Sequence, residues 1–302
     1  LPQIGTLRRG IGMALWFHGA GFTGSGERDL IKAVLKLQKS KDGIVTILAS
    51  QSDIGQGIMT TLSKIAAREL NIPLDRVIYQ NPDTSKVPDS GPTVASRSLM
   101  TVGEMVRRAS IKLADIWKDG EEQEIEERFI EPDFVIPFDL SKFHGDAYPT
   151  YAWAVAAIEL EVDTLTGSHN VLGAWGSFDV GTPIDENIVR GQMEGGFLQG
   201  IGYASMERMA ADRKGRIRDN SYADYIIPTA MDVPVLEVQL HVEKYPLGPY
   251  GAKGAGELPL VGVPAAYVEA LEQALGGAPI CHIPVTAQET LSLLKTKGGG
   301  RR

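Results

Sequence analysis

Hydrophobic positions recur at helical spacing in four parts of the chain. Residues 58–70 and 99–116 carry apolar side chains at steps of three and four, and Gly120 follows the second run as a stop signal. A third helix is predicted over 187–209, although its five glycines each cost about 1 kcal/mol relative to alanine, so that something must offset them. The last predicted helix, over 264–275, begins with Pro264 in the first turn, a position that suits proline.

Other stretches have the short or alternating apolar pattern of strands. Residues 45–50 form a β-rich run just before a glycine turn, and residues 236–242 alternate apolar and polar side chains. The runs 151–162 and 170–180 are separated by turn residues and predict a β-hairpin. The carboxylate-rich run 121–127 predicts a solvated connection, and the proline-punctuated stretch up to residue 150 predicts irregular structure.

The mixture of strands and helices lacks a strict strand–helix–strand alternation, so the predicted fold class is α+β with mixed sheets. A length of 302 residues fits one large domain or two ordinary ones. We expect two interlocked subdomains, 1–150 and 151–302. The sequence contains no internal repeat.

Composition and charge narrow the function classes. Hydrophobic residues make up 43% and charged residues 23% of the chain, which is typical of a globular protein, and 38 acidic against 30 basic residues give a formal charge of −8. Such a chain lacks the excess of Lys and Arg that a nucleic-acid partner requires. The single cysteine, Cys281, rules out an internal disulfide and an iron–sulfur cluster held by this chain alone.

The longest charge-free stretch, residues 10–26, is rich in glycine and too short in continuous apolar residues for a membrane span. No leader peptide is visible, so we expect a soluble, cytoplasmic protein without a membrane partner. Because the sequence begins with Leu1, we also expect it to be trimmed or to be part of a longer chain.

Two glycine-framed loops lie at predicted helix starts. The first is Asp53-Ile54-Gly55-Gln56-Gly57, and the second is Asp89-Ser90-Gly91-Pro92-Thr93-Val94-Ala95-Ser96. Backbone N–H groups at a helix start attract anions, and the hydroxyl groups of the second loop could surround a phosphate or an oxo ligand. A plain turn in the first loop and N-capping of a helix in the second are the structural alternatives.

Two further segments carry an amide and a carboxylate. In Gln192 to Gly200, the side chains of Gln192, Gly196 and Gln199 share one helical face, although the glycines could equally serve close helix packing. In Gly251 to Leu260, Glu257 ends a glycine loop and precedes apolar residues. A carboxylate in an apolar environment is suited to accept a proton near neutral pH, whereas an ordinary surface glutamate is the alternative.

Together and in this order, these segments resemble the molybdenum hydroxylases, the family of xanthine dehydrogenase and aldehyde oxidoreductase. The likeness extends over nearly the whole chain and is to the C-terminal half of the molybdopterin-binding subunit. Asp179-Val180-Gly181 and Pro284-Val285-Thr286 also match, whereas Leu258 replaces a proline that many relatives carry. The resemblance implies Glu257 as the general base and assigns to the pterin cofactor the residues Gly55, Gln56, Gly57, Thr93, Val94, Ala95, Ser96 and Gln199.

His18-Gly19-Ala20-Gly21-Phe22-Thr23 looks like the segment that holds the heteroaromatic substrate in xanthine dehydrogenases. The resemblance therefore implies that Phe22 stacks on a purine-like ring and that Thr23 lies beside it, with Phe22 as an ordinary core residue being the alternative. His18 is interpreted as a loop residue, since in this family the pterin, and not protein side chains, holds the metal.

The resemblance also implies cofactors and partners. It predicts molybdopterin, as the cytosine dinucleotide, with molybdenum, and iron–sulfur clusters and FAD on partner chains. The N-terminal half of the subunit is absent from this sequence and is expected on another chain or segment. The predicted reaction is hydroxylation of xanthine or hypoxanthine with water as the oxygen source. Oxidation of nicotinate or an aldehyde, and a non-catalytic nucleotide- or cofactor-binding module, are the alternatives.

Overall fold

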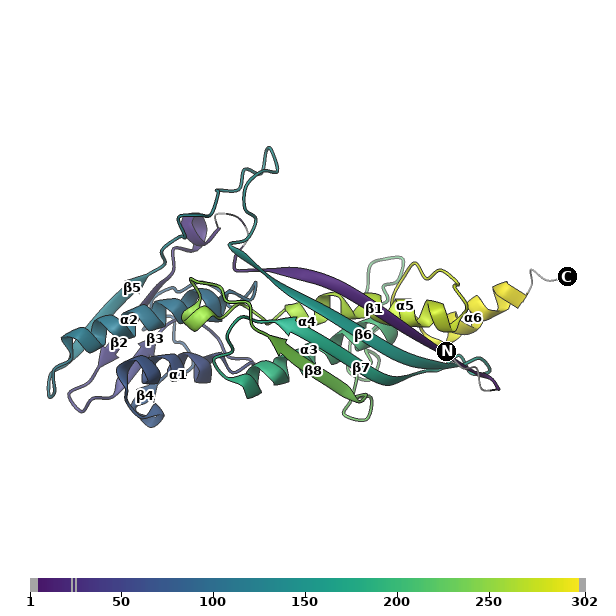
Figure 1. Cartoon of the computed structure of the whole chain (residues 1–302), viewed down its shortest axis with the longest axis horizontal. Coiled ribbons are helices and arrows are strands. Elements are labelled where there is room, and N and C mark those ends of the chain that lie inside the picture. The colour runs from purple at the N-terminus through teal and green to yellow at the C-terminus, as the bar shows by residue number, and fades with distance from the viewer. Residues whose placement is uncertain (1–4, 23, 25, 299–302) are drawn as a thin grey trace.

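The computed structural model describes residues 5–22, 24 and 26–298, and two four-stranded sheets form its framework (Figure 1). In the first sheet, β1 is antiparallel to β6, β6 is antiparallel to β7, and β7 is parallel to β8. In order across the sheet, these strands are β1 (Leu7–Ala20), β6 (Thr150–Asp163), β7 (His169–Asp179) and β8 (Leu236–His241). Across the second sheet they are β4 (Val77–Ile78), β3 (Val45–Leu48), β2 (Val34–Lys39) and β5 (Gln123–Arg128).

Helices cover one face of each sheet. The second sheet packs against α1 (Ile58–Leu70) and α2 (Gly103–Ile116), and the π-helical turns η1 (Glu27–Ile31) and η3 (Ser98–Val102) lie beside them. The other helices gather around the first sheet: α3 (Glu186–Ser205), α4 (Leu258–Val261), α5 (Val263–Ala274) and α6 (Ala287–Gly298). Two 3₁₀ turns, η2 (Leu74–Arg76) and η4 (Pro249–Gly251), complete the elements. The expected α+β class with mixed sheets is confirmed.

Close contact between β1 and α5 closes the first core. A Cβ atom on Gly10 would lie 1.9 Å from the carbonyl oxygen of Ala270, and one on Gly12 would lie 2.1 Å from that of Ala266. Only glycine therefore lets the helix backbone rest directly on the strand. Trp16, on the same face of β1, meets Phe178 edge to face with ring centroids 6.2 Å apart.

Most predicted elements are confirmed, with ends that differ by a few residues. The helix predicted up to Gly120 ends at Ile116, and the third helix ends at Ser205. Strands β1 and β2 and helix α6 were not predicted, because glycines interrupt the pattern of β1 and the other two segments carry weak periodicity.

The prediction of a solvated connection over 121–127 is wrong, because most of that run lies in β5. This strand pairs with β2, and its Glu127 side chain is only 3% exposed. Glu127 is tolerated there because Lys112 and Arg108 of α2 approach its carboxylate oxygens to 2.6 and 3.3 Å. Buried charge of one sign thus follows from cross-element pairing that the sequence pattern does not display.

The first strand connects the two ends of the chain's first half. All fourteen residues of β1 pair with β6, from Leu7 opposite Asp163 to Ala20 opposite Thr150. The chain then enters the second sheet and returns through the irregular stretch before β6 (Figure 1). The division into subdomains 1–150 and 151–302 stays a prediction.

Candidate functional site

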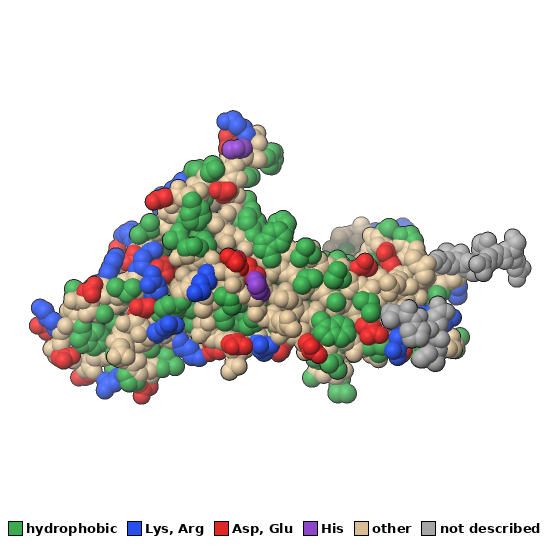
Figure 2. Space-filling view, viewed as in Figure 1, with side chains coloured by type: hydrophobic (Ala, Val, Ile, Leu, Met, Phe, Trp, Pro, Cys, Tyr) green, Lys and Arg blue, Asp and Glu red, His purple; other side chains and the backbone are tan. Residues whose placement is uncertain are grey.

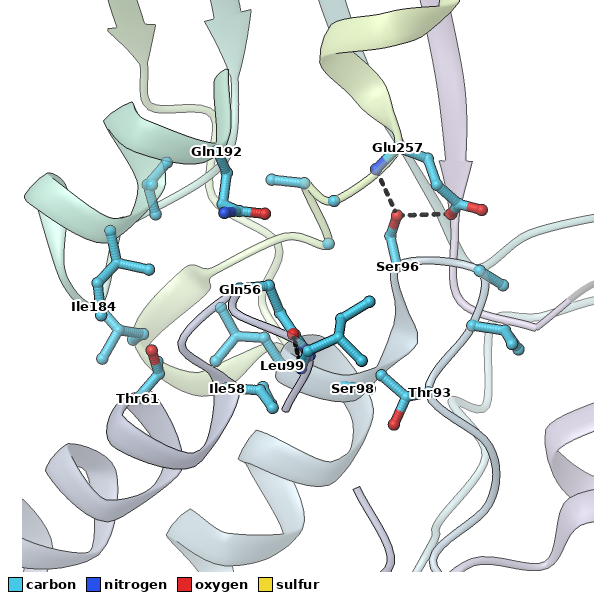
Figure 3. Close-up of a pocket in the computed structure, with 18 of the residues that line it drawn as sticks. Gln56, Ile58, Thr61, Thr93, Ser96, Ser98, Leu99, Ile184, Gln192 and Glu257 are labelled. Atoms are coloured by element: carbon cyan, nitrogen blue, oxygen red, sulfur yellow. Dashed lines mark hydrogen bonds between the residues drawn. The ribbon is translucent and has the colours of Figure 1, made fainter. Parts of the chain in front are cut away.

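A cavity of about 320 Å³ lies where the start of α1, the loop before η3 and the start of α3 meet (Figure 3). The glycine segment that carries Glu257 forms another wall. All four segments that the sequence singled out therefore reach this cavity, although they are far apart in the chain. Its lining includes Ile54, Gln56, Thr93, Val94, Ala95, Ser96, Gln192, Gly254, Ala255, Gly256 and Glu257.

In the first loop, Asp53 binds the backbone N–H groups that were expected to be free for an anion. Its Oδ1 accepts from Gly55 at 2.8 Å and Gly57 at 3.3 Å, and its Oδ2 accepts from Met59 at 3.1 Å. Burial alone would raise the pKa of Asp53, but these hydrogen bonds outweigh it and hold the pKa below its usual range. The anion at the start of α1 is thus a side chain of the protein itself.

Gln56 lines the cavity while its amide closes the loop. Its Oε1 accepts from the Ile54 N–H at 2.7 Å, and its Nε2 donates to the Ser52 carbonyl at 2.9 Å. Gly55 and Gly57 have φ values of +115° and +79°, which only glycine adopts at low cost. The loop therefore places Gln56 at the cavity in a fixed orientation.

The second loop contains an unusual backbone. Ala95 and Ser96 have φ values of 53° and 51°, a left-handed conformation that is costly for residues with a side chain. Arg97, which is fully buried, holds this turn by donating to the carbonyls of Ser90 at 3.0 Å and Pro92 at 2.9 Å. The guanidinium also forms a buried ion pair with Glu27.

Gln51, which follows β3, holds the same loop from the other side. Its buried amide donates to the Gly91 carbonyl at 2.8 Å and accepts a hydrogen bond from Ser98. Sequence reasoning missed Gln51 and Arg97. A polar side chain directly after a strand was the available signal for Gln51, whereas nothing local indicated the role of Arg97.

Glu257 lies at the mouth of the cavity in direct contact with Ser96 (Figure 3). The Ser96 hydroxyl donates to Glu257 Oε2 at 2.7 Å and accepts from the Glu257 backbone N–H at 3.0 Å. The carboxylate is 52% exposed, so the apolar enclosure expected from the sequence is not complete in this chain. The hydroxyl of Ser96 thus sets the direction in which the carboxylate points.

His18 belongs to β1 and not to a loop, which corrects the prediction. Its Nε2 lies 3.7 Å from Glu257 Oε2. Trp16, two residues earlier on the same face of the strand, donates its indole N–H to the Leu258 carbonyl at 2.8 Å. The strand therefore holds the backbone next to Glu257.

Of the two glutamines on the glycine helix, only Gln192 lines the cavity, and its side chain points into it in Figure 3. Gln199 is exposed and two turns further along α3, about 10 Å from Gln192 along the helix axis. The shared helical face seen in the sequence is real, but only its N-terminal end reaches the cavity.

Phe22 is half-buried and does not line the cavity. Its ring lies against Gly26, where a Cβ atom would be 2.0 Å from the ring. The backbone N–H of the preceding Gly21 donates to the Ala95 carbonyl at 3.1 Å, so Phe22 lies next to the second loop. Thr23 lies outside the described residues.

The polar groups around the cavity suit an oxygen-rich ligand. The backbone N–H groups of Ala95, Ser96, Ala255 and Gly256, and the amide of Gln192, form no hydrogen bond with any other described residue. Gly254 lies so close to the second loop that a Cβ would be 2.0 Å from the Ser96 carbonyl oxygen. These unpaired donors fit the phosphate and carbonyl oxygens of a pterin cofactor.

Two searches of the described part of the chain found no further centre. No group of three or more His, Cys, Asp or Glu side chains among those residues is arranged to hold a metal ion. Within the same residues, no helix has the length and apolar character needed to cross a bilayer.

Comparison with known proteins identifies the family. A family model of the molybdopterin cofactor-binding domain matches residues 2–234. Mouse (Mus musculus) aldehyde oxidase 4 is 31% identical over 235 residues, which are 72% of this chain and 18% of that protein. A probable subunit of xanthine dehydrogenase from Bacillus subtilis is 29% identical over 329 aligned residues, covering 98% of this chain and 43% of that protein.

A solved structure agrees with this result. The aldehyde oxidoreductase from Desulfovibrio desulfuricans superposes with a TM-score of 0.85 at 26% identity, over 96% of this chain and 33% of that one. The chain therefore spans less than half the length of each of these relatives. Since the family model covers most of its residues, the chain belongs to the molybdopterin cofactor-binding domain family, within the molybdopterin-binding subunit of the molybdenum hydroxylases.

Proposed function

We propose that this chain forms part of the active site of a molybdenum hydroxylase that oxidises a purine-like heteroaromatic ring with water as the oxygen source. The observation that carries the proposal is the Glu257 carboxylate, held 2.7 Å from Ser96 at the mouth of a cavity lined by unpaired donors. The donors of the second loop, of Ala255 and Gly256, and of Gln192 would hold the pterin. Gln199 was assigned to the cofactor by resemblance; its exposed position favours Gln192 for that role.

The geometry indicates how Glu257 acts as a base. The Ser96 hydroxyl binds Oε2, whereas Oε1 accepts no hydrogen bond from any described residue. Oε1 is therefore the atom available to take up the proton that is released as the water-derived oxygen adds to the substrate carbon. When bound, the molybdenum–pterin group takes the two electrons of the oxidation.

Replacing Glu257 with Gln in the complete enzyme tests this role. The amide keeps the shape and the contact with Ser96 but cannot take up the proton. We expect turnover to fall by a factor of about 10²–10⁴, the usual contribution of a general base, with molybdenum content unchanged. Turnover within about tenfold of the parent enzyme would contradict the assignment.

The matched control is Glu237→Gln, which removes the charge of an exposed glutamate on β8 away from the cavity. This variant should keep full turnover. Equal losses in both variants would mean that Glu257 has no special role.

The substrate class is tested with a panel on the complete enzyme. We propose xanthine or hypoxanthine, because Phe22 belongs to a segment that resembles the ring-stacking segment of xanthine dehydrogenases and lies beside Ala95. Two of the relatives are named for aldehyde oxidation, which keeps an aldehyde as the second candidate, with nicotinate as the third. A preference for simple aldehydes over both purines would reject the purine substrate.

The cofactors and partners follow from the same proposal. We propose the cytosine dinucleotide form of molybdopterin, with iron–sulfur clusters and FAD on partner chains, in the cytoplasm. Metal analysis and pterin fluorescence of the protein purified with its natural partners test this. Absence of both molybdenum and pterin would favour a non-catalytic nucleotide-binding module.

We further propose that an N-terminal chain or segment of the subunit covers the outer face of the first sheet. This apolar sheet face comprises Ile11, Met13, Leu15, Phe17, Trp153 and Trp175, each between 40% and 71% exposed. Phe17 and Trp153 lie with ring centroids 5.0 Å apart. Apolar side chains are gathered across the middle of the surface in Figure 2, and a patch of this extent is typical of an interface.

A further inference from the structure

Lys253 and Asp179 form a buried ion pair that the proposed mechanism does not use. Lys253 lies in the glycine segment, four residues before Glu257, and only 5% of its side chain is exposed. Its Nζ is 2.6 Å from Asp179 Oδ2 and 3.1 Å from the Tyr151 carbonyl oxygen. Neither residue lines the cavity, so the pair does not act on a bound ligand.

The pair joins four parts of the chain at one point. Asp179 ends β7, and its Oδ1 also accepts from the Gly181 N–H at 3.1 Å and from the Glu243 N–H at 3.3 Å. Tyr151 is at the start of β6, and the Lys253 backbone N–H donates to the Val180 carbonyl at 3.0 Å. These bonds fasten the glycine segment to the end of the β6–β7 sheet.

Fold stability alone is a weak explanation for such a pair. Removing two charges from water costs about as much as their attraction returns, and apolar replacements of buried pairs are often as stable. A buried pair does fix a geometry, because only one arrangement satisfies both charges.

The geometry that this pair fixes is that of Ser96 and Glu257. Gly254 directly follows Lys253 and touches the Ser96 carbonyl oxygen so closely that no side chain fits between them. Ser96 in turn holds Glu257 through two hydrogen bonds. Any displacement of Lys253 therefore moves Gly254 against Ser96 and changes the direction of the Glu257 carboxylate.

We infer that Lys253 and Asp179 are positioning residues that hold Glu257 in place through Gly254 and Ser96. The catalytic meaning of this inference rests on the proposed function, whereas its structural content does not.

Hydrogen–deuterium exchange of the Glu257 backbone amide on the full chain tests the structural content. Asp179→Asn removes one charge and keeps the shape, and the double variant Asp179→Asn/Lys253→Met leaves no unpaired buried charge. In both we expect the Glu257 amide, which donates to Ser96, to exchange at least about tenfold faster. Unchanged exchange in either folded variant would overturn the inference.

The control is Lys39→Met. Lys39 is a second buried lysine, 2% exposed, which donates to the backbone carbonyls of Lys118 at 2.8 Å and Glu121 at 2.7 Å at the far end of the second sheet. Its loss should leave exchange at Glu257 unchanged. Equal acceleration in Lys39→Met would show a general loosening and would also overturn the inference.

The complete enzyme supplies the catalytic readout. We expect Asp179→Asn to lower kcat by about tenfold with KM and molybdenum content nearly unchanged, because the base is misaligned while binding is not affected. Unchanged kcat together with faster exchange would overturn the positioning role in catalysis. A parent enzyme without hydroxylase activity would instead contradict the proposed function, and the exchange measurement would still decide the structural inference.

Discussion

At the scale of single residues, His169 of β7 shows how burial sets a charge state. The half-buried imidazole lies 2.9 Å from the Tyr267 hydroxyl through Nδ1 and 2.6 Å from the Thr290 hydroxyl through Nε2. Desolvation lowers the pKa of His169 from 6.5 to about 4. The ring is therefore neutral in the folded protein at pH values where the unfolded chain would protonate it.

This difference makes the stability depend on pH. Because the folded pKa lies below the unfolded one, stability is lost as the pH falls from about 6.5 towards 4, by at most about 3 kcal/mol from this residue. His169→Gln should remove that part of the loss, measured as the free energy of urea unfolding at pH 7 and pH 4.5. The exposed His144→Gln serves as the control, and an identical pH dependence in parent and His169→Gln would refute the assignment.

At the scale of elements, helix α3 explains its own glycines. A Cβ on Gly196 would lie 2.4 Å from the Pro259 ring, and one on Gly200 would lie 2.6 Å from Val263. These glycines let α3 rest on α4 and α5, and the close packing offsets their low helix propensity. Gly195, on the exposed side, has nothing within 4 Å of its Cβ position.

The same helix therefore supplies a matched pair of variants. Gly200→Ala should destabilise the fold by about 1–3 kcal/mol, since Val263 cannot move without displacing α5. Gly195→Ala should stabilise it by up to about 1 kcal/mol, because alanine favours the helix and meets no neighbour. Both are read from chemical unfolding, and effects of the same sign would show that α3 does not pack as described.

At the scale of the whole molecule, the apolar sheet face is the surface that a second chain or segment would cover. Leu15, the most exposed of its side chains at 71%, should contribute to that contact without contributing to the fold. We expect Leu15→Lys to leave the unfolding free energy nearly unchanged and to prevent co-purification with the N-terminal segment of the subunit. Leu165→Lys, on a 72% exposed side chain in the turn between β6 and β7, should associate normally. Normal association of Leu15→Lys would remove this face from the proposed interface.

Local patterns in the sequence were sufficient for the elements that depend on neighbouring residues. Helix α1 was predicted with its observed ends, and the β6–β7 hairpin within a residue or two, because amphipathic spacing and turn residues act over a few positions. Strand β1 was missed since its Gly10 and Gly12 are explained only by helix α5, more than 250 residues away. The burial of Glu127 in β5 likewise depends on two cations from α2.

The sequence by itself determined the fold class, the family and the four segments that reach the cavity, because these depend on residue types in a fixed order. Only the tertiary structure decided which atoms of those segments are available. It showed that Asp53 binds the amides of the first loop, that Gln192 and not Gln199 meets the cavity, and that Ser96 directs Glu257. The physical reason is that a hydrogen bond requires two groups within about 3 Å, and the chain brings residues 96 and 257 to that distance only after both sheets have formed.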